Sequence, residues 1–300
     1  MTLSTVPDRR AVAAPYAPAL ADDSNQLDNA GFLAAVRRAA AGLRAARVTT
    51  GDVVAIMLPD SIELLVSLFA TWRSGATASL VDPLLTDSET SRRIAEAGAE
   101  ILIAQRSLAD TLSVRTVTSV RELCVAEPGA TEAAPPSPEA PALITYGGGS
   151  KRTVLDHRNL EAMCRLVIEV FALTDTEHSL SIMPMWQMSG ILVGALSPLV
   201  AGGRATVGGA VDPRTFLERI ERTRPTYFSA VPGLYAALSE LPGRIPRTIS
   251  SVRFAICCAA PAGIELKTEF KDRYGIPIVN GYGLSQVIAR AHSIGSPASA

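Results

Sequence analysis

The chain has 300 residues, which is long enough for two fused lobes with sizeable hydrophobic cores. Its 28 basic and 29 acidic residues balance to a formal charge of −1, so we expect no surface for nucleic acid or for an anionic membrane. Four cysteines without metal-ligand spacing and three histidines argue against a disulfide framework and against a multi-histidine metal site.

Apolar periodicity in the first part of the chain predicts strands that alternate with helices. Residues 1–21 are expected to form a loose arm without a secretory signal, and no window approaches the apolar length of a membrane span, so we expect a cytoplasmic protein. Asp60 or Ser61 is placed to cap the second helix. The predicted elements are helices over 29–46, 62–73 and 88–97 and strands over 53–58, 76–81 and 101–104.

The alternation resumes after residues 127–142, a segment rich in Pro and Ala that reads as an exposed connection. The further predicted elements are strands over 142–145, 180–184, 204–207, 226–231, 252–257 and 276–280 and helices over 159–171, 191–200 and 216–223, with another after Pro232. This order predicts an α/β fold of two interleaved lobes, each a mainly parallel sheet flanked by helices. We expect a first lobe over 22–141, a second over 142–293 and a flexible tail over 294–300.

A glycine-rich segment follows the strand at 142–145 in the sequence LITYGGGSKRTVLDHRNL. Here the strand is expected to run into three glycines, a serine and a lysine, and then into a helix. Glycines allow backbone N–H groups to wrap a phosphate, and Lys151 adds a positive charge. The alternative interpretation is an ordinary turn after a strand.

Three further segments end predicted strands with small or aromatic residues. They are IMPMWQMSGIL over 182–192, CCAAPAG over 257–263 and VNGYGLSQ over 279–286. Open α/β sheets bind ligands at the carboxyl ends of their strands, where these segments are predicted to lie. Tyr282 can stack on a flat ring or pack inside a turn, and the sequence leaves both open.

The order of these segments resembles the N-terminal domain of the AMP-forming, adenylate-forming ligases, which include acyl-CoA and aryl-CoA ligases, peptide-synthetase adenylation domains and luciferases. DHRNL, FSAVPGLYAAL, APAG and NGYGLSQ are similar to family motifs in the same order, and TTGDVVAIMLP is similar to an upstream family stretch. The resemblance covers residues 25–290. It implies the two-lobed α/β fold and the activation of a carboxylic acid with ATP.

The resemblance also implies three groups of site residues. The phosphate loop corresponds to Gly147, Gly148, Gly149, Ser150 and Lys151. The nucleotide-binding positions correspond to Cys258, Ala259, Ala260, Asn280, Gly281, Tyr282, Gly283, Ser285 and Gln286. The acid pocket is edged by Trp186, Gln187 and Gly190. The implied ligands are ATP or AMP with Mg²⁺ and a hydrophobic carboxylic acid or acyl group.

The sequence departs from the family pattern at several ATP-handling positions. The phosphate loop is shorter and has lost its hydroxyl-rich triplet, and Gln286 stands where the family has a Glu that binds Mg²⁺. Gln187 stands where many relatives have a His. The sequence also stops before the family's barrel subdomain and its C-terminal lid, so we expect both to be lacking. A preorganised anion-binding donor and a bound metal ion each stabilise the transition state. Losing two such contributions would raise the activation barrier of the ATP-dependent step by about 5 kcal/mol and slow it a few thousand-fold.

Three hypotheses follow for function. The first is a degenerate domain that keeps an acyl pocket or a partner-binding role and no longer activates acids with ATP. The second is residual or partner-assisted adenylation of a hydrophobic acid, and the third is that the natural protein is longer. No catalytic residue is assigned and no protein metal ligand is expected.

Two further expectations concern new chemistry and partners. A repurposed site could use Cys258 or His157, although a buried thiol and a helix-terminal histidine are the simpler interpretations. The face left by the lacking barrel and lid is expected to be apolar, and it predicts self-association or a protein partner.

Overall fold

A computed structural model describes residues 2–104, 116–125, 134–146, 152–209, 211–242 and 247–281. Its contacts divide the chain into two compact units. The first contains Met1–Leu20 and Asn25–Ala162, and the second contains Ala21–Ser24 and Met163–Ala300. The division falls within one helix, α6 (His157–Val170).

The first unit is built on a six-stranded sheet in the order β6-β5-β3-β4-β7-β8. All neighbouring strands in it are parallel except β7 and β8, which are antiparallel. Val54 to Met57 and all of β4 and β5 are buried, because helices cover both faces of a parallel sheet. The strands are β3 (Val53–Met57), β4 (Thr77–Leu80), β5 (Ile101–Ala104), β6 (Thr116–Thr118), β7 (Pro141–Tyr146) and β8 (Arg152–Asp156).

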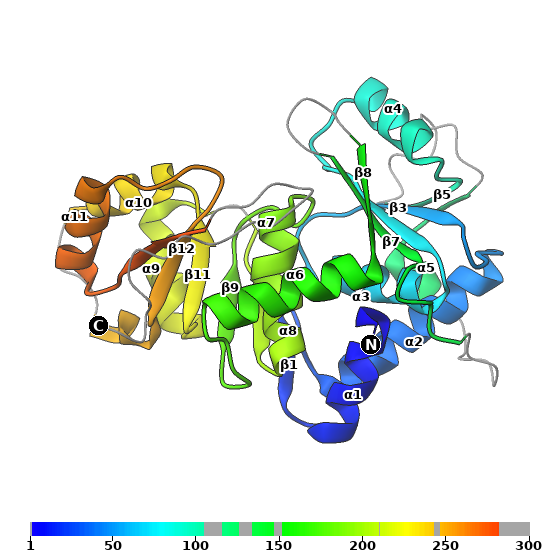
Figure 1. Cartoon of the computed structure of the whole chain (residues 1–300), viewed down its shortest axis with the longest axis horizontal. Helices are drawn as coiled ribbons and strands as arrows, with labels where there is room; N and C mark the ends of the chain where they lie inside the picture. Colours follow the sequence, from blue (N-terminus) through cyan, green and yellow to red (C-terminus); the bar gives the residue numbers. More distant parts are fainter. Residues whose placement is uncertain are drawn as a thin grey trace. The chain divides into compact units, whose positions relative to one another are not determined.

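Two helices of the first unit begin at side-chain caps, of which the sequence indicates the one at Ser61. Ser61 accepts a hydrogen bond from the N–H of Leu64, and Thr86 and Glu89 form a reciprocal capping box. Figure 1 shows α4 on one side of the sheet and α2 and α3 on the other. The helices are α2 (Asn29–Ala45), α3 (Ile62–Arg73), α4 (Asp87–Ala97) and α5 (Val120–Leu123).

Residues 2–21, expected as a loose arm, carry a 3₁₀ turn (Leu3–Thr5), α1 (Val6–Ala13) and strand β1 (Pro18–Ala21), and β2 (Gln26–Asp28) follows. Asp8 on α1 forms an ion pair with Arg73 at 2.7 Å. The buried Arg10 donates a hydrogen bond from Nε to Asn29 at 2.8 Å, and burial lowers the pKa of its guanidinium to about 10. These long-range polar contacts, together with the burial of Leu3, Val6 and Leu20, hold this segment in place. Local sequence pattern does not specify long-range contacts, so the segment was not predicted.

The second unit is built on five parallel strands in the order β13-β12-β11-β9-β10. Their carboxyl ends therefore meet at one edge of the sheet. The strands are β9 (His178–Ser181), β10 (Arg204–Val207), β11 (Tyr227–Ala230), β12 (Phe254–Cys257) and β13 (Ile278–Asn280).

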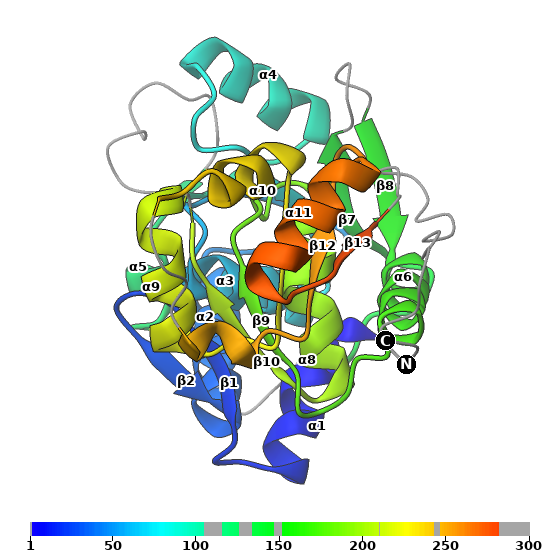
Figure 2. The same ribbon diagram turned by 90° about the vertical axis from the view of Figure 1, so that its left-hand side faces the viewer.

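Neighbouring residues of β11 show how the two faces of this sheet are covered. Phe228 packs edge-on against Phe216 of α9, whereas Tyr227 stacks on Phe254 on the opposite face. In Figures 1 and 2, α9, α10 and α11 lie together on one side of the strands, and α7 and α8 lie on the other. The bounds are α7 (Met188–Ile191), the π-helix η3 (Leu192–Leu196), α8 (Ser197–Ala201), α9 (Pro213–Thr223), α10 (Pro232–Ser239), the 3₁₀ turn η4 (Arg247–Ser251) and α11 (Ile264–Tyr274).

The predicted α/β class with sheets flanked by helices is confirmed. The compact units differ from the predicted lobes, because β7 and β8 pair into the first sheet and carry the first unit to Ala162 rather than to residue 141. The predicted helix over 191–200 is observed as the consecutive α7, η3 and α8. In the part of the chain that is described, no helix has both the length and the apolarity to cross a bilayer.

Candidate functional site

The carboxyl edge of the second sheet collects three of the four segments that the sequence singles out. Residues 182–192 follow β9, residues 257–263 begin at the last residue of β12, and residues 279–286 begin inside β13. Since the three strands are parallel, these segments leave the sheet at the same edge. The topology thus supports a single ligand site there.

A tight turn at the end of β12, here called the bare turn, has small side chains and exposes the peptide groups of Ala259 and Ala260 at this edge. Ala259 has a φ of 68°, and the N–H of Ala260 donates to the carbonyl of Cys258 at 2.9 Å. A left-handed conformation costs an alanine roughly 1–2 kcal/mol, so the turn needs support from its surroundings. Ala259 and Ala260 are exposed and small, so a flat ring can lie directly on their peptide groups.

Asn280 supplies that support from the neighbouring strand. Its Oδ1 accepts from the N–H of Ala262 at 2.9 Å, and its Nδ2 donates to the carbonyl of the same residue at 3.1 Å. Gly281 continues the ladder by donating its N–H to the carbonyl of Cys257 at 2.8 Å. Asn280 thus holds the chain just after the turn, which is a positioning role that the motif alone did not specify.

The two adjacent cysteines are protonated thiols. Burial raises the pKa of Cys257 to about 11 and that of Cys258 to about 12. Cys257 also donates from its Sγ to the carbonyl of Ala260 at 3.3 Å. His157, in the first unit, is only 1% exposed, and burial lowers its pKa to about 4. A nucleophilic thiol must ionise, so these groups do not favour repurposed cysteine chemistry.

We expect Cys258 to resist alkylation by iodoacetamide in the native protein and to react only after unfolding, because its thiol is buried and protonated. Peptide mass spectrometry after timed labelling measures this, with the partly exposed Cys124 as the internal reference. Labelling of Cys258 faster than Cys124 under native conditions would contradict this assignment.

The acid-pocket residues follow β9 around a tight turn. Trp186 and Gln187 are partly exposed, and the N–H of Gln187 donates to the carbonyl of Pro184 at 3.0 Å. Gly190 packs so closely under this turn that a Cβ atom would lie 2.1 Å from the Pro184 oxygen. Gly190 therefore shapes the turn rather than lining an open space. Met185 and Met188, which the sequence leaves between pocket lining and core, are buried.

A π-helical turn follows directly, and no sequence pattern indicated it. Tyr227 donates its hydroxyl to the carbonyl of Val193 in η3 at 2.8 Å. A Cβ atom on Gly194 would lie 2.2 Å from the Oγ of Ser181, so the turn sits directly on β9. π-turns inside helices are frequent at functional sites, and this one adjoins the predicted acid pocket.

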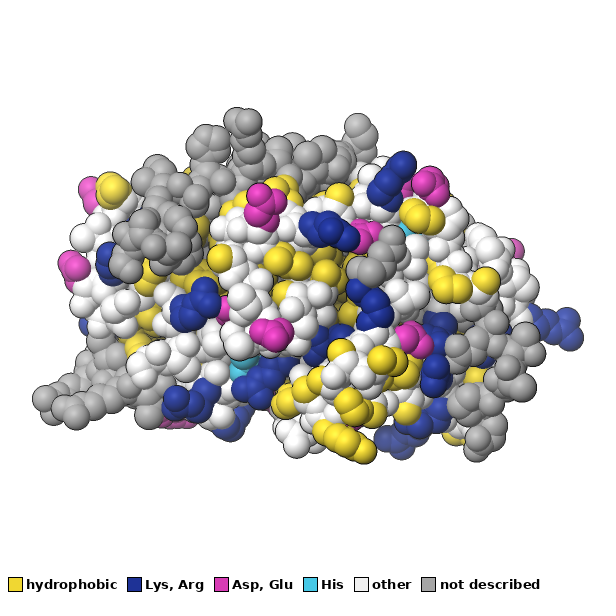
Figure 3. Space-filling model, turned by 60° about the horizontal axis from the view of Figure 1, so that its bottom comes forward, with side chains coloured by type: hydrophobic (Ala, Val, Ile, Leu, Met, Phe, Trp, Pro, Cys, Tyr) yellow, Lys and Arg dark blue, Asp and Glu magenta, His cyan; other side chains and the backbone are white. Residues whose placement is uncertain are grey.

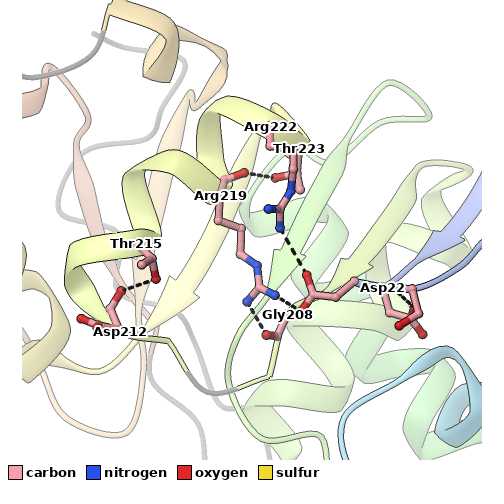
Figure 4. A network of polar contacts seen from close by, with 9 residues as sticks. Asp22, Gly208, Asp212, Thr215, Arg219, Arg222 and Thr223 are labelled. Atoms are coloured by element: carbon pink, nitrogen blue, oxygen red, sulfur yellow. Dashed lines mark hydrogen bonds and ion pairs between the residues drawn. The ribbon is translucent and has the colours of Figure 1, made fainter.

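An arginine of α9 holds the loop after β10, and Figure 4 draws this network. Arg219 donates to the carbonyl of Gly208 and forms an ion pair with Asp23. Gly208 in turn donates its N–H to the carbonyl of Ser181 at 2.7 Å. Arg222 pairs with the same Asp23 at 3.3 Å. Arg219 thus connects the 21–24 segment with the loop beside β9, and no sequence motif pointed to it.

Replacing Arg219 with lysine is expected to lower the free energy of unfolding by about 1 kcal/mol, because one ammonium group cannot reproduce the forked contact to Gly208 and Asp23. Hydrogen exchange at Gly208 and Gly209 should accelerate. Arg222→Lys is the matched control, since that side chain is 67% exposed and should change stability by less than about 0.5 kcal/mol. Equal effects of the two substitutions would refute the assignment.

The remaining predicted site residues, namely Gly147, Gly148, Gly149, Ser150, Lys151, Tyr282, Gly283, Ser285 and Gln286, lie outside the described residues. The predicted passage from the glycine segment straight into a helix is wrong, because β8 intervenes before α6. Asp156 already accepts the N–H of Asn159 at 2.6 Å at the start of α6. A phosphate therefore cannot use this helix terminus without meeting a carboxylate.

The residue before the glycine segment is held from the first unit's α4. The guanidinium of Arg93 lies 4.0 Å from the centroid of the Tyr146 ring, and the Tyr146 hydroxyl donates to the Arg93 carbonyl at 3.0 Å. This double contact fixes the end of β7, from which the glycine segment departs. The face in Figure 3 shows Lys and Arg side chains interspersed with Asp and Glu, in keeping with the balanced charge of the chain.

Open α/β sheets bind ligands at the carboxyl ends of parallel strands, and this is where the exposed turn at Ala259 and Ala260 lies. The family model of the AMP-binding enzymes matches residues 7–296, so the chain belongs to the family of AMP-binding enzymes.

Known proteins of this kind are similar over nearly the whole chain. A feruloyl-CoA synthase from Amycolatopsis sp is 30% identical over 304 residues, covering 97% of this chain and 62% of the relative. The anthranilate CoA ligase AuaEII, solved with anthranoyl-AMP, superposes with a TM-score of 0.88 at 19% identity, covering 99% of this chain and 62% of that one. ATP-bound MatB from Rhodopseudomonas palustris gives 0.84 at 22% identity, covering 95% and 60%. The chain therefore spans about 60% of the length of these proteins.

Proposed function

We propose that this chain is the nucleotide- and acid-binding domain of an acyl-CoA ligase-like protein, and that its ATP-dependent activation of acids is impaired. The observation that carries the proposal is the bare turn at Ala259 and Ala260 on the carboxyl edge of the second sheet. The departures at Gln187 and Gln286 and the shortened glycine segment support the impaired activation.

The described part of the edge fits the base of AMP or ATP. The exposed peptide groups of Ala259 and Ala260 offer a flat surface, and Asn280 and Gly281 fix the neighbouring strand end. In this proposal Tyr282 stacks on the base and Lys151 meets a phosphate. When bound, ATP supplies the adenylyl group that activates a carboxylate. Gln286 offers Mg²⁺ an amide oxygen, a poorer ligand than a carboxylate, which weakens the hold on the triphosphate more than on AMP.

The acid is proposed to be aromatic or otherwise hydrophobic and to bind beside Trp186. Gln187 can donate a hydrogen bond to a carboxylate but cannot carry the charge of a protonated histidine. The 30% identity to a feruloyl-CoA synthase supports an aromatic acid as the first choice. Residual adenylation, by this chain alone or with a partner chain, is the second candidate function. It is favoured by the exposed turn at Ala259 and Ala260 and by the two hydrogen bonds between Asn280 and Ala262.

Calorimetric titration of the 300-residue chain with AMP, with Mg-ATP and then with ferulate tests the proposal. Binding of AMP, with Mg-ATP no tighter and no acid-dependent exchange of pyrophosphate into ATP, supports impaired activation. Micromolar, metal-dependent ATP binding with exchange supports residual adenylation instead. Binding of neither nucleotide would refute the proposed nucleotide site.

A substitution locates the nucleotide. Ala260→Leu places a branched side chain over the turn and should abolish AMP binding while leaving the fold intact, because Ala260 is exposed. Ala45→Leu, at an exposed position of α2 in the first unit, is the matched control and should bind AMP like the unmodified chain. Unchanged AMP affinity in Ala260→Leu would place the base elsewhere.

A further inference from the structure

The sheet of the first unit ends in β8, and no described strand pairs with the outer edge of β8. Figure 2 shows β8 as the outermost strand beside β7. An edge strand presents backbone N–H and C=O groups to which a strand of another chain can bind. The five residues of β8 contain no proline and no lysine, and the register shift of the β7–β8 pair lies in β7. These common devices that protect an edge from pairing are therefore lacking in β8.

Two hydrogen bonds establish which backbone groups of β8 point outward. The N–H of His157 donates to the carbonyl of Ala140, next to β7, at 3.2 Å. The N–H of Asp156 donates instead to Oδ1 of Asn159 at 3.2 Å. In an antiparallel pair, every second residue directs its N–H and C=O groups to the same side of the strand. The N–H of Val154, two residues before Asp156, therefore points away from β7 and toward the open edge.

The side chains on one face of β8 are complementary to themselves in an antiparallel pairing. Val154 lies at the centre of the strand and is 43% exposed, and Arg152 and Asp156 lie on the same face, two residues to either side. In a pairing centred on Val154, Arg152 of each copy lies opposite Asp156 of the other, and opposite charges favour this register. Asp156 lies 3.7 Å from Arg158, which also pairs with Glu139, so this end of the strand keeps a net negative charge that attracts Arg152.

We infer that β8 pairs antiparallel with β8 of a second copy of this chain, about a two-fold axis at Val154. The N–H of Val154 in each copy donates to the Val154 carbonyl of the other, and the two sheets become one continuous sheet. The same strand is used by both copies, so the contact closes as a dimer and does not continue into a filament. This interface belongs to the first unit and does not depend on the proposed nucleotide site.

Sedimentation equilibrium of the 300-residue chain over a range of concentrations tests this. We expect a monomer–dimer equilibrium that becomes about ten-fold weaker in Arg152→Glu, which places like charges opposite each other at both ends of the pairing. Arg214→Glu, at an exposed position of α9, is the matched control and should stay within about two-fold of the unmodified chain. A chain that is monomeric at every concentration, or a dimer that both substitutions weaken equally, would overturn the inference.

Oxidative cross-linking provides a second readout that locates the two-fold axis. Opposite residues of a hydrogen-bonded antiparallel pair have Cα atoms about 5.5 Å apart, which suits a disulfide. Val154→Cys should therefore form a covalent dimer on oxidation, visible by non-reducing electrophoresis. Thr153→Cys is the matched control and should not exceed the background of the unmodified chain, because Thr153 lies opposite Leu155 of the second copy in this register. A dimer that Val154→Cys does not cross-link, or that both substitutions cross-link equally, would place the interface elsewhere.

Discussion

Replacing Gly190 with alanine is expected to destabilise the protein by about 3 kcal/mol and to weaken binding of the acid. The added Cβ atom would lie 2.1 Å from the Pro184 oxygen and 2.6 Å from the Met183 oxygen, and both are backbone atoms. A flexible side chain could move aside, but here the turn that carries Trp186 and Gln187 must shift as a whole. Urea unfolding monitored by circular dichroism gives the stability change.

Gly233→Ala is the matched control for this prediction. Gly233 lies in α10 and has no atom within 4 Å of an added Cβ. Alanine is a better helix former than glycine by about 1 kcal/mol, so this variant should be neutral or more stable. If Gly190→Ala unfolds at the same urea concentration as Gly233→Ala, the close packing under the turn is refuted.

Acid is expected to destabilise the protein through two buried histidines. Burial lowers the pKa of His157 and of His178 from 6.5 to about 4. Each folded pKa lies below its unfolded value, so the unfolded chain binds the proton more readily. The stabilisation is complete above pH 6.5, declines as pH falls and is lost by pH 4. Each histidine should cost about 2 kcal/mol at pH 5 relative to pH 7.

Burial, and after it the charge of Arg204, explain why protonation of His178 is unfavourable, and the contact with the Arg224 carbonyl offsets this only in part. The His178 side chain is 4% exposed. Its Nδ1 atom lies 3.2 Å from the carbonyl oxygen of Arg224, and the neutral ring donates to this oxygen when its one proton is on Nδ1. The Nε2 atom lies 2.7 Å from the Thr206 hydroxyl, which can donate a hydrogen bond to it in the neutral ring.

Urea unfolding at pH 7, 6 and 5 measures the effect. His178→Gln keeps polar atoms at the site but does not titrate, so the dependence of its stability on pH should be shallower by about 2 kcal/mol over this range. His157→Phe should do the same in the first unit, where the ring packs edge-on against Trp72 at 5.5 Å. Parallel pH profiles of the unmodified chain and both variants would contradict the prediction.

Elements with a strong period and a clear cap were predictable from the sequence. The helices over 29–46 and 62–73 and the strand over 101–104 correspond closely to α2, α3 and β5. The apolar spacing that predicts each of these elements lies within the element's own short stretch of sequence. β8 was missed because its five residues follow a glycine segment and pair with β7, so the pattern read as a loop that opens a helix. Strand formation depends on pairing and packing context, which local periodicity does not show.

The candidate site was predictable only in its location. Motif order placed residues 257–263 and 279–286 at strand ends, and parallel pairing brings β12 and β13 to one edge. The hydrogen bonds between Asn280 and Ala262 join residues 18 positions apart, and the contact of Arg219 with Gly208 joins residues 11 positions apart. The spacing of motifs along the sequence does not specify such side-chain contacts. The π-turn at η3 likewise depends on its fit over Ser181.

The left-handed Ala259 has a consequence for the trade-off between stability and preorganisation. A glycine would relieve the strain of this turn, yet it would also free the backbone to sample many shapes before any ligand arrives. Alanine narrows that ensemble, so less conformational entropy is lost when a flat ring settles on the turn. The chain therefore forgoes some folding stability at Ala259 and in return presents a rigid surface to the nucleotide base that we propose binds there.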